Sequence, residues 1–194
     1  MRRAQYIEKI INSLDSYPLE EFTVRRMAEI LGTSPMALYK HFKNKQVLLA
    51  SIAFEGFLRL EIELNQIVET QAPSQRDLIQ SMIICYYNYG NQYPNLYRLM
   101  FGNDTINFQS HQDLVDQANG VMDILIQAIG LVCTKNNLKL KTDSEHEASI
   151  YLWSSVHGVV MSQIDNRVAY WRFNFDIDKY ASFLESNLWM NSRQ

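Results

Sequence analysis

The chain has 194 residues and a formal net charge of -3, with 47% hydrophobic and 20% charged residues, a composition ordinary for a soluble globular protein of one large or two small domains. Its two cysteines, Cys85 and Cys133, lie far apart and lack metal-ligand spacing, so we expect no disulfide framework, no metal site and no cofactor. We also expect no secretion signal and no apolar segment close to the roughly 20 residues that span a bilayer, which favours a cytoplasmic protein without a membrane partner.

Charge is unevenly distributed along the sequence. Residues 1–50 contain eight Lys or Arg against five Asp or Glu, whereas the other 144 residues contain ten against sixteen. An acidic protein with a basic N-terminal region can still bind a polyanion through that region. A nucleic-acid contact is therefore sought first among the N-terminal fifty residues.

Two helices are expected at the N-terminus. Apolar residues at helical spacing from Tyr6 to Leu14 predict the first. Thr23 stands before the segment Val24–Leu31 as the expected N-cap of the second, and Gly32 supplies the tight turn after it.

Ser34 followed by Pro35 is a strong signal for the start of a third helix, because proline at the first helical position gives up only an N–H that would be unpaired. This helix is about seven residues long, Pro35 to His41, and is too short to be stable without packing. A long amphipathic helix follows from Lys45 to about Thr70, and the sequence Ala72-Pro73-Ser74 indicates a joint after it.

The rest of the chain also carries helical spacing and no strand pattern. Thr142 with Glu145 forms a possible capping box before the penultimate helix. The fold class is therefore all-α, with about nine helices. The last five helices are expected at about 74–91, 94–101, 111–135, 144–164 and 176–190.

The second and third predicted helices, with the glycine turn between them, form a helix-turn-helix pattern, in which the second helix lies in the major groove of DNA. The expected inner residues are Met27, Ala28, Leu31, Leu38 and Phe42. The expected outward residues are Thr33, Ser34, Met36, Tyr39, Lys40 and His41, with Lys43 and Lys45 just beyond. A merely solvated helix face is the alternative, but such a face usually mixes Glu with Lys, and no acidic residue occurs from Thr33 to Lys45.

This region resembles the DNA-binding domain of the TetR family of bacterial transcription regulators, from Arg3 to about Leu49. The matching residues are Thr23, Met27, Ala28, Leu31, Gly32, Ser34, Ala37, Leu38, Tyr39, His41, Phe42, Lys45, Leu48 and Leu49. Two positions depart from the pattern: Gln46 stands where the family usually has an acid, and Met36 where it often has glycine. The resemblance implies a helix-turn-helix domain over residues 1–47 and a ligand-binding and dimerisation domain over residues 48–194.

The resemblance also implies eight DNA-binding residues. The hydroxyls of Thr23 and Ser34 would hold phosphates. The side chains that would approach base edges or the adjacent backbone are Thr33, Met36, Tyr39 and Lys40. Those that would grip phosphates are Tyr39, His41 and Lys45. A recognition helix of this length touches only a few base pairs, so a useful regulator must bind a palindromic operator in double-stranded DNA as a homodimer.

The C-terminal part resembles the TetR C-terminal domain type named for a Trp-His-Gly signature, here Trp153, His157 and Gly158. In the broader family the last two long helices pair with their copies as a four-helix bundle. The implied dimer-interface residues are Gly158, Tyr180, Phe183, Leu184, Asn187 and Leu188. The alternative is that these residues pack within the core of a monomer.

Aromatic residues are concentrated between Tyr86 and Phe101. Members of the family bind small molecules between the C-terminal helices, and an apolar cavity with a few polar groups suits that role. The candidate ligand-binding residues are Met82, Tyr86, Tyr89, Tyr97, Trp153 and His157. Aromatic residues at helical spacing also form ordinary cores, which is the competing interpretation.

Three functional hypotheses follow. The first is a repressor that an unidentified small effector, apolar or aromatic, releases from its operator. The second is a regulator of the same fold without a small-molecule ligand. The third is a helical enzyme or small-molecule carrier, which the sequence disfavours because it contains no G-x-S-x-G elbow, phosphate loop or H-E-x-x-H motif.

Overall fold

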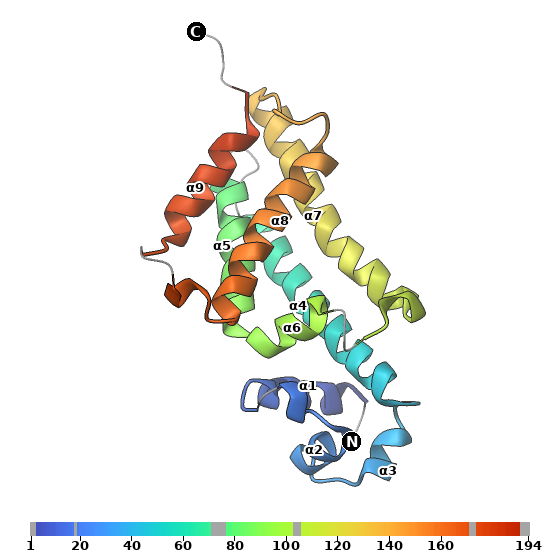
Figure 1. The fold of residues 1–194 in the computed structure, drawn as a ribbon. Helices are drawn as coiled ribbons and strands as arrows, with labels where there is room; N and C mark the ends of the chain where they lie inside the picture. Colours follow the sequence, from blue (N-terminus) through green and yellow to red (C-terminus); the bar gives the residue numbers. More distant parts are fainter. Residues whose placement is uncertain (1–2, 18, 71–76, 103–105, 171–173, 191–194) are drawn as a thin grey trace. The chain divides into compact units, whose positions relative to one another are not determined.

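The computed structural model describes residues 3–17, 19–70, 77–102, 106–170 and 174–190. These residues form nine α-helices, three short 3-10 helices and a single isolated antiparallel bridge between Leu140 and Trp189 (Figure 1). The predicted all-α class is therefore confirmed. The joint expected at Ala72-Pro73-Ser74 lies outside the described residues.

The chain divides into two compact units. The first, here called the head unit, contains residues 1–59 and 93–118, and the second, the body unit, contains residues 60–92 and 119–194. Each unit is therefore built from two separate stretches of chain. The functional boundary expected after residue 47 stays a prediction.

The head unit contains the predicted helix-turn-helix. Its elements are α1 (Arg3–Leu14), η1 (Leu19–Glu21), α2 (Val24–Ile30), α3 (Pro35–Tyr39), the start of α4 (Lys45–Thr70), α6 (Pro94–Phe101), η2 (Phe108–Ser110) and the start of α7 (Gln112–Asn136). The predicted N-cap Thr23 is confirmed, since its Oγ1 accepts from Arg26 N at 3.2 Å. The helix start predicted at Ser34-Pro35 is also confirmed, and Ser34 is the N-cap there, with its Oγ accepting from Ala37 N at 3.2 Å. Helix α3 ends two residues earlier than expected, where His41 N donates to Leu38 O at 2.9 Å in a tight i to i−3 bond.

The core of the head unit joins α6 to α1 and to the start of α4. Asn95 donates from its backbone N–H to Asp15 Oδ1 at 2.8 Å, and from its side-chain amide to the carbonyl oxygens of Leu14 and Tyr17 at 3.0 Å each. Carbonyls at the end of a helix have no partner within it, so this amide caps α1 from outside. Gly56 on α4 packs so closely on α6 that an added Cβ would lie 2.6 Å from Met100 Sδ.

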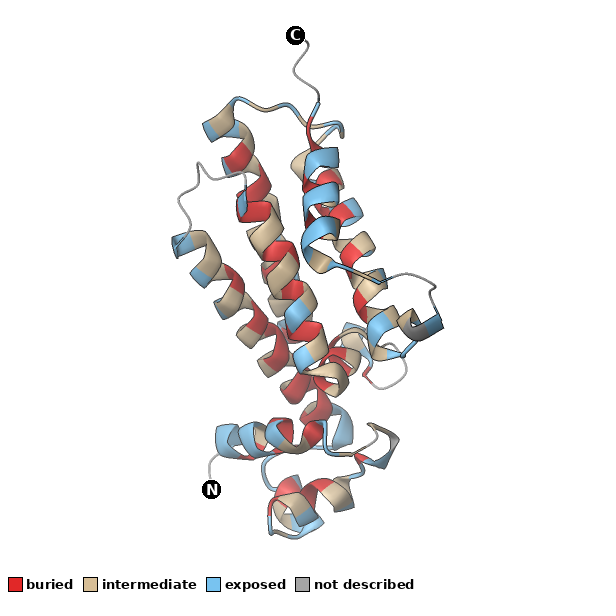
Figure 2. Ribbon diagram, turned by 90° about the vertical axis from the view of Figure 1, so that its left-hand side faces the viewer, coloured by how far each residue is buried: buried red, intermediate tan, exposed pale blue. Residues whose placement is uncertain are grey.

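The body unit is a bundle in which α5 packs against both α8 and α9. Buried residues recur along its helices between exposed and half-buried ones (Figure 2). Its elements are the end of α4, α5 (Asp77–Gln92), most of α7, α8 (Glu145–Ile164), η3 (Val168–Tyr170) and α9 (Ile177–Leu188). These positions agree with the predicted helices to within a few residues at each end.

The predicted capping box at Thr142 and Glu145 is wrong. The N-cap of α8 is Ser144, whose side chain accepts from Glu147 N at 3.2 Å. The Glu147 carboxylate in turn accepts from Asp143 N at 2.9 Å. Thr142 instead donates its hydroxyl proton to the Ser144 carbonyl at 3.0 Å. The capping pair at the start of α8 is therefore Ser144 and Glu147, two residues further along the chain than the expected pair.

Helix α7 departs from the expectation that no segment suits a membrane span. By length and composition alone it is the one helix, among the residues described, that could cross a membrane. A single helix of this kind is weak evidence, because helices of soluble proteins meet the same two criteria.

Candidate nucleic-acid interface

Helix α3 has an inner and an outer side, as the sequence predicts. Leu38 and Phe42 point inward and are each only 1% exposed, and the other predicted inner residues are also buried. Met36 is 72% exposed and Tyr39 47% exposed. Of the other predicted contact residues, Thr23, Ser34, Lys40, His41 and Lys45 are exposed and Thr33 is half-buried.

Two residues of α1 hold the end of the recognition segment in place. The ring of Tyr6 meets that of His41 edge to face, with 5.1 Å between centroids. The Arg3 guanidinium lies over the Phe42 ring, 5.0 Å from its centroid, and also donates to Ser51 Oγ at 2.6 Å. Sequence reasoning missed Arg3 and Tyr6 as positioning residues, because their partners are far along the chain.

The hydroxyls of Thr23 and Ser34 combine capping with a capacity to donate. Each oxygen accepts from a backbone N–H of its own helix. A hydroxyl also carries one proton of its own. Both side chains are thus fixed by their helix termini and can still donate to a phosphate oxygen.

Lys45 stands at the first position of α4, and the cap that places it there is Asn44. Asn44 Oδ1 accepts from Val47 N at 2.9 Å, and its carbonyl accepts from Leu48 N at 3.2 Å. Asn is a favoured N-cap residue, so Asn44 directly before Lys45 is itself a sequence signal for this helix start. The exposed Lys45 side chain therefore starts from a well-defined helix terminus.

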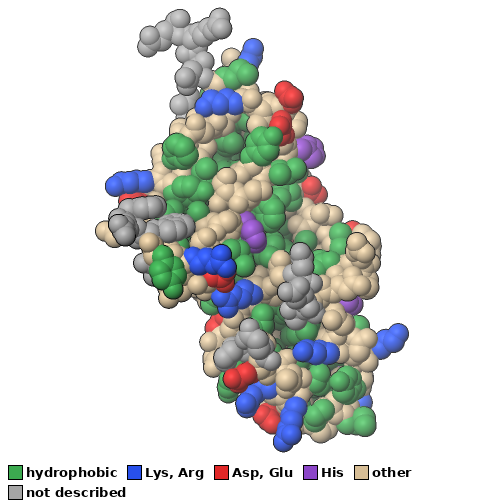
Figure 3. Space-filling model, viewed as in Figure 1, with side chains coloured by type: hydrophobic (Ala, Val, Ile, Leu, Met, Phe, Trp, Pro, Cys, Tyr) green, Lys and Arg blue, Asp and Glu red, His purple; other side chains and the backbone are tan. Residues whose placement is uncertain are grey.

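The arginines of α2 and the lysines around α3 differ in charge balance. Arg25 and Arg26 form ion pairs with Glu29 at 3.4 and 3.0 Å, and Arg26 also lies 3.9 Å from Glu21. Over the part of the chain that the structure describes, no ion pair holds Lys40, Lys43 or Lys45. On the face shown in Figure 3, Lys and Arg side chains lie at several places on the lower part of the molecule, with Asp and Glu side chains beside some of them. Positive charge is thus left unbalanced beside the exposed side of α3.

The candidate ligand-binding residues fall into two groups. Met82, Tyr86 and Tyr89 on α5 are buried in the body unit, with 2%, 8% and 1% of their surface exposed. Tyr97 belongs to the head unit, where it is fully buried and lies 4.6 Å from Phe101 between ring centroids. The arrangement of each group is that of a packed core.

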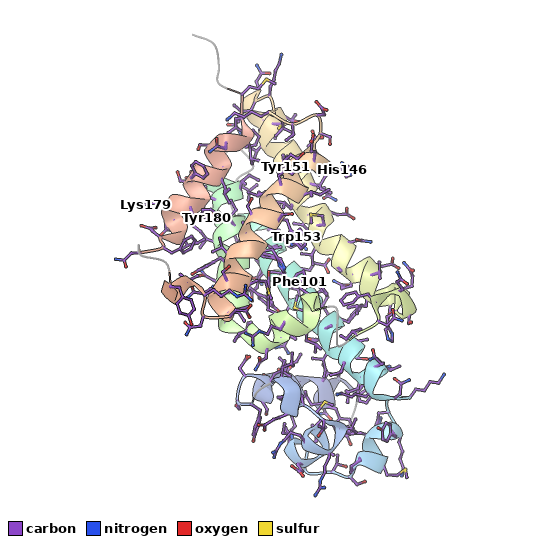
Figure 4. The ribbon with its side chains drawn as sticks, viewed as in Figure 1. Phe101, His146, Tyr151, Trp153, Lys179 and Tyr180 are labelled. Atoms are coloured by element: carbon purple, nitrogen blue, oxygen red, sulfur yellow. The ribbon has the colours of Figure 1, made fainter. Side chains whose placement is uncertain are left out.

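Trp153 and His157 on α8 form a cluster with Tyr86. Trp153 Nε1 donates to the Tyr86 hydroxyl oxygen at 2.9 Å, and the Trp153 and His157 rings stack with centroids 5.0 Å apart. Trp153 is labelled on α8 in Figure 4. Burial lowers the pKa of His157 below its ordinary value of 6.5. The cluster thus favours a neutral imidazole beside an aromatic ring.

The candidate dimer residues do not all face the same way. Phe183 is 61% exposed, and Asn187 and Gly158 are also on the surface. Tyr180 is half-buried and donates from its hydroxyl to the Ser155 carbonyl at 3.1 Å, which ties α9 to α8. Leu184 is half-buried and Leu188 is buried within the protomer. The exposed side of α8 adds two residues that the sequence did not single out, Ile150 and Tyr151.

Other reactive groups are few among the described residues. No group of three His, Cys, Asp or Glu there is placed to hold a metal ion. Burial, with the neighbouring Glu63 carboxylate, raises the pKa of the Cys85 thiol to about 12. The thiol lies 3.7 Å from Glu63 Oε2 as a donor and is not a nucleophile at neutral pH.

Comparison with known families decides the identity of both regions. Residues 10–52 match the family model described as bacterial regulatory proteins of the tetR family. Residues 79–185, more than half of the chain, match that of the tetracycline repressor-like C-terminal domain. The chain belongs to the TetR family. The model that matches residues 10–52 describes bacterial regulatory proteins, which favours a regulator over an enzyme. The Trp-His-Gly subtype stays a prediction.

Two curated proteins match parts of the chain. The class C tetracycline repressor of Escherichia coli is 42% identical over 53 residues, 27% of this chain and 24% of that protein. The nucleoid occlusion factor SlmA of Alteromonas mediterranea is 29% identical over 108 residues, 52% of this chain and 51% of that protein. The chain therefore spans about a quarter and about half the length of these two relatives.

Solved structures share the TetR-family fold along nearly the whole chain. A protein of unknown function from Rhodococcus sp. RHA1 has a TM-score of 0.78 at 18% identity, covering 97% of this chain and 95% of that one. The transcriptional regulator FadR of Bacillus subtilis, in complex with stearoyl-CoA, has a TM-score of 0.74 at 15% identity, covering 95% and 96%. At these identities the likeness concerns the fold alone.

Proposed function

We propose that this TetR-family regulator is a repressor that binds a palindromic operator as a homodimer and is released by a small apolar or aromatic effector. The observation that carries the DNA-binding part is the unbalanced positive charge at Lys40, Lys43 and Lys45, beside an outward side of α3 that no acidic residue interrupts. Lysines without a protein partner neutralise phosphates and release counterions from DNA.

The exposed surface of α8 and α9 supports the homodimer. Ile150, Tyr151 and Phe183 are 53%, 57% and 61% exposed. A Cβ built at Gly158, on the exposed side of α8, meets no described atom within 4 Å apart from the backbone of its own helix. Large exposed apolar side chains on neighbouring helices are typical of an interface between copies. A partner helix would then approach α8 most closely at Gly158.

The effector is supported by the body unit and by one structural relative. FadR of Bacillus subtilis, which shares the fold, was solved with stearoyl-CoA. In this chain, apolar and aromatic side chains of α5 face α8, with the hydroxyl of Tyr86 and the imidazole of His157 as polar groups. These side chains are packed against one another, so an apolar ligand with a polar end would have to separate them in order to bind. In the proposed dimer, the effector favours a state in which the two recognition helices are spread too far apart to fit the operator. It releases DNA only to the extent that it binds this state more tightly than the DNA-binding state.

A second candidate is a regulator without a small-molecule ligand. The residues on α5 assigned to the effector are buried as a packed core. One relative is named as a nucleoid occlusion factor, a role at the nucleoid. A thermal-shift screen with amphiphilic and aromatic compounds separates the two: an effector raises the melting temperature, while a complete lack of response favours this candidate.

The DNA-binding proposal is tested with the promoter region beside the protein's own gene. In an electrophoretic mobility shift assay, the wild type should bind this duplex, and scrambling one half of the palindrome should abolish the shift. Tyr39→Ala and Lys45→Ala should each weaken binding by at least tenfold. Lys45→Ala should also reduce the slope of log affinity against log salt by about one for each phosphate contact, hence by about two for a dimer.

Lys139→Ala provides the matched control, because Lys139 is an exposed lysine of the body unit outside the proposed interface. It should leave both affinity and salt slope unchanged. Circular dichroism must show that all three variants are folded. Unchanged operator affinity in both Tyr39→Ala and Lys45→Ala would refute the contact assignments.

A further inference from the structure

The head unit exposes two large apolar side chains among its described residues, Met36 and Tyr39. Both come from α3, a helix of five residues, and they are three positions apart. Residues at this spacing are neighbours on one side of a helix. Two exposed apolar side chains side by side on so short a helix suggest that a binding partner covers them.

The side-chain chemistry of Met36 limits which kind of group this partner can place against it. Its side chain carries no hydrogen-bond donor and only a weak sulfur acceptor, so it serves neither a phosphate nor a polar base edge. The residue is nevertheless 72% exposed, so most of this apolar side chain is in contact with water. Met36 follows Pro35 in the first turn of α3, and the first turn of a recognition helix is the part that meets base edges.

The surrounding charge favours a nucleic acid over a protein surface. Lys40 is four residues beyond Met36 on the same side, and Lys43 and Lys45 follow without an intervening acid. None of the three is held by an ion pair within the described parts of the chain. In the major groove, the one apolar group that a base pair presents is the C5-methyl of thymine. Flexible methionine side chains adapt well to such small apolar groups.

We propose that Met36 packs on thymine C5-methyl groups in the major groove, so that each operator half-site contains a thymine selected by its methyl group. Tyr39 closes the other side of this contact with its ring, while its hydroxyl is free to reach the phosphate backbone. The inference rests on the proposed DNA-binding function and names the base edge that α3 reads.

The first stage of the test finds the sequence. The full-length protein selects from duplexes that carry two randomised half-sites in inverted repeat. A thymine should be enriched at one fixed position in each half. If no sequence is enriched, the proposed operator binding fails, and the assignment of Met36 fails with it.

The second stage isolates the methyl group. The selected thymine is replaced by deoxyuridine, which pairs identically and lacks only the methyl. The wild type should lose about fourfold in affinity for one replaced half-site, the effect of burying one methyl-sized group, and about fifteenfold for both. Met36→Ala should bind the thymine and deoxyuridine duplexes equally.

Three variants sharpen the result. Met36→Leu keeps an apolar side chain and should retain the preference for thymine, whereas Met36→Gln has a similar length and should lose it. Met190→Ala removes another exposed methionine, in the body unit, and should behave as wild type. An enriched sequence with equal affinity for thymine and deoxyuridine, or full discrimination by Met36→Gln, would overturn the assignment and leave the proposed regulator intact.

Discussion

The exposed side of α3 and the aromatic side of α5 are both candidate binding regions, but they differ in their exposure to solvent. On α3, Met36 and Tyr39 are 72% and 47% exposed, and their lysine neighbours lack ion pairs within the described chain. On α5, Tyr86 and Tyr89 are buried. A binding site on the surface can be recognised from exposed apolar side chains and from charged side chains without an ion pair. A binding site inside the protein, lined by the same kinds of side chain, looks like an ordinary packed core when no ligand separates those side chains.

The largest expected effect concerns the two sides of α3. Leu38→Ala removes a side chain that is 1% exposed and should lower the free energy of unfolding by about 2–5 kcal/mol. Met36→Ala, two residues away, should change it by less than about 0.5 kcal/mol, because an exposed side chain leaves no cavity. Urea unfolding followed by circular dichroism measures both. Similar losses in the two variants would contradict the two-sided arrangement of this helix.

Two glycines extend the comparison to the helices that support each region. Gly56 packs against fully buried residues of α6, with an added Cβ 2.6 Å from Met100 Sδ and 3.1 Å from Leu96 Cδ1. Gly56→Ala should therefore destabilise the protein by about 1–3 kcal/mol, the usual cost of overpacking. Differential scanning calorimetry should show a lower melting temperature. A rise would mean that Met100 and Leu96 move aside.

Gly158→Ala should have the opposite effect on the isolated protomer. Among the described residues, no atom beyond the backbone of its own helix lies within 4 Å of the added Cβ, and alanine favours a helix over glycine by about 0.5–1 kcal/mol. In the proposed homodimer, however, the new methyl group keeps the partner helix away. Analytical ultracentrifugation should thus show weaker self-association although the protomer is no less stable. Self-association as strong as that of the wild type would remove Gly158 from the interface.

The smallest expected effect is the pH dependence due to His157. Burial lowers its pKa in the folded state below 6.5, so on acidification the unfolded chain takes up a proton first. Stability is therefore lost as the pH falls through 6.5 towards the lower folded pKa. His157→Gln should show a smaller loss between pH 7 and pH 5.5, measured as the free energy of unfolding in urea. An identical pH profile would mean that His157 does not titrate in this range.

Local signals predicted most of the fold and the outer side of α3. Thr23 and Ser34 cap helices through bonds to residues three positions away, which sequence spacing can identify. The same reasoning failed at Thr142, because Ser144, two residues on, offers its own hydroxyl and has a glutamate at the matching distance. Where two capping pairs compete, spacing alone does not choose between them.

Contacts across long stretches of chain were not predictable. Arg3 reaches Ser51, 48 residues away, and Asn95 reaches Asp15, 80 residues away. No periodicity within either segment encodes these partners. The candidate effector-binding residues could not be predicted for another reason. Apolar residues at helical spacing occur both in a packed core and in the wall of a ligand cavity, so spacing does not distinguish the two. The expectation for Tyr97 shows this, because it lies in the head unit, apart from the other five.

The three hydrogen bonds of Asn95 also bear on how such a protein can be rearranged in evolution or in the laboratory. They attach a helix from the middle of the chain to the end of the first helix, so the head unit consists of two pieces of sequence. A single crossover between two regulators, placed after residue 59, would give the new head a foreign α6. Chimaeras that exchange operator recognition should therefore transfer residues 93–118 together with the N-terminal segment.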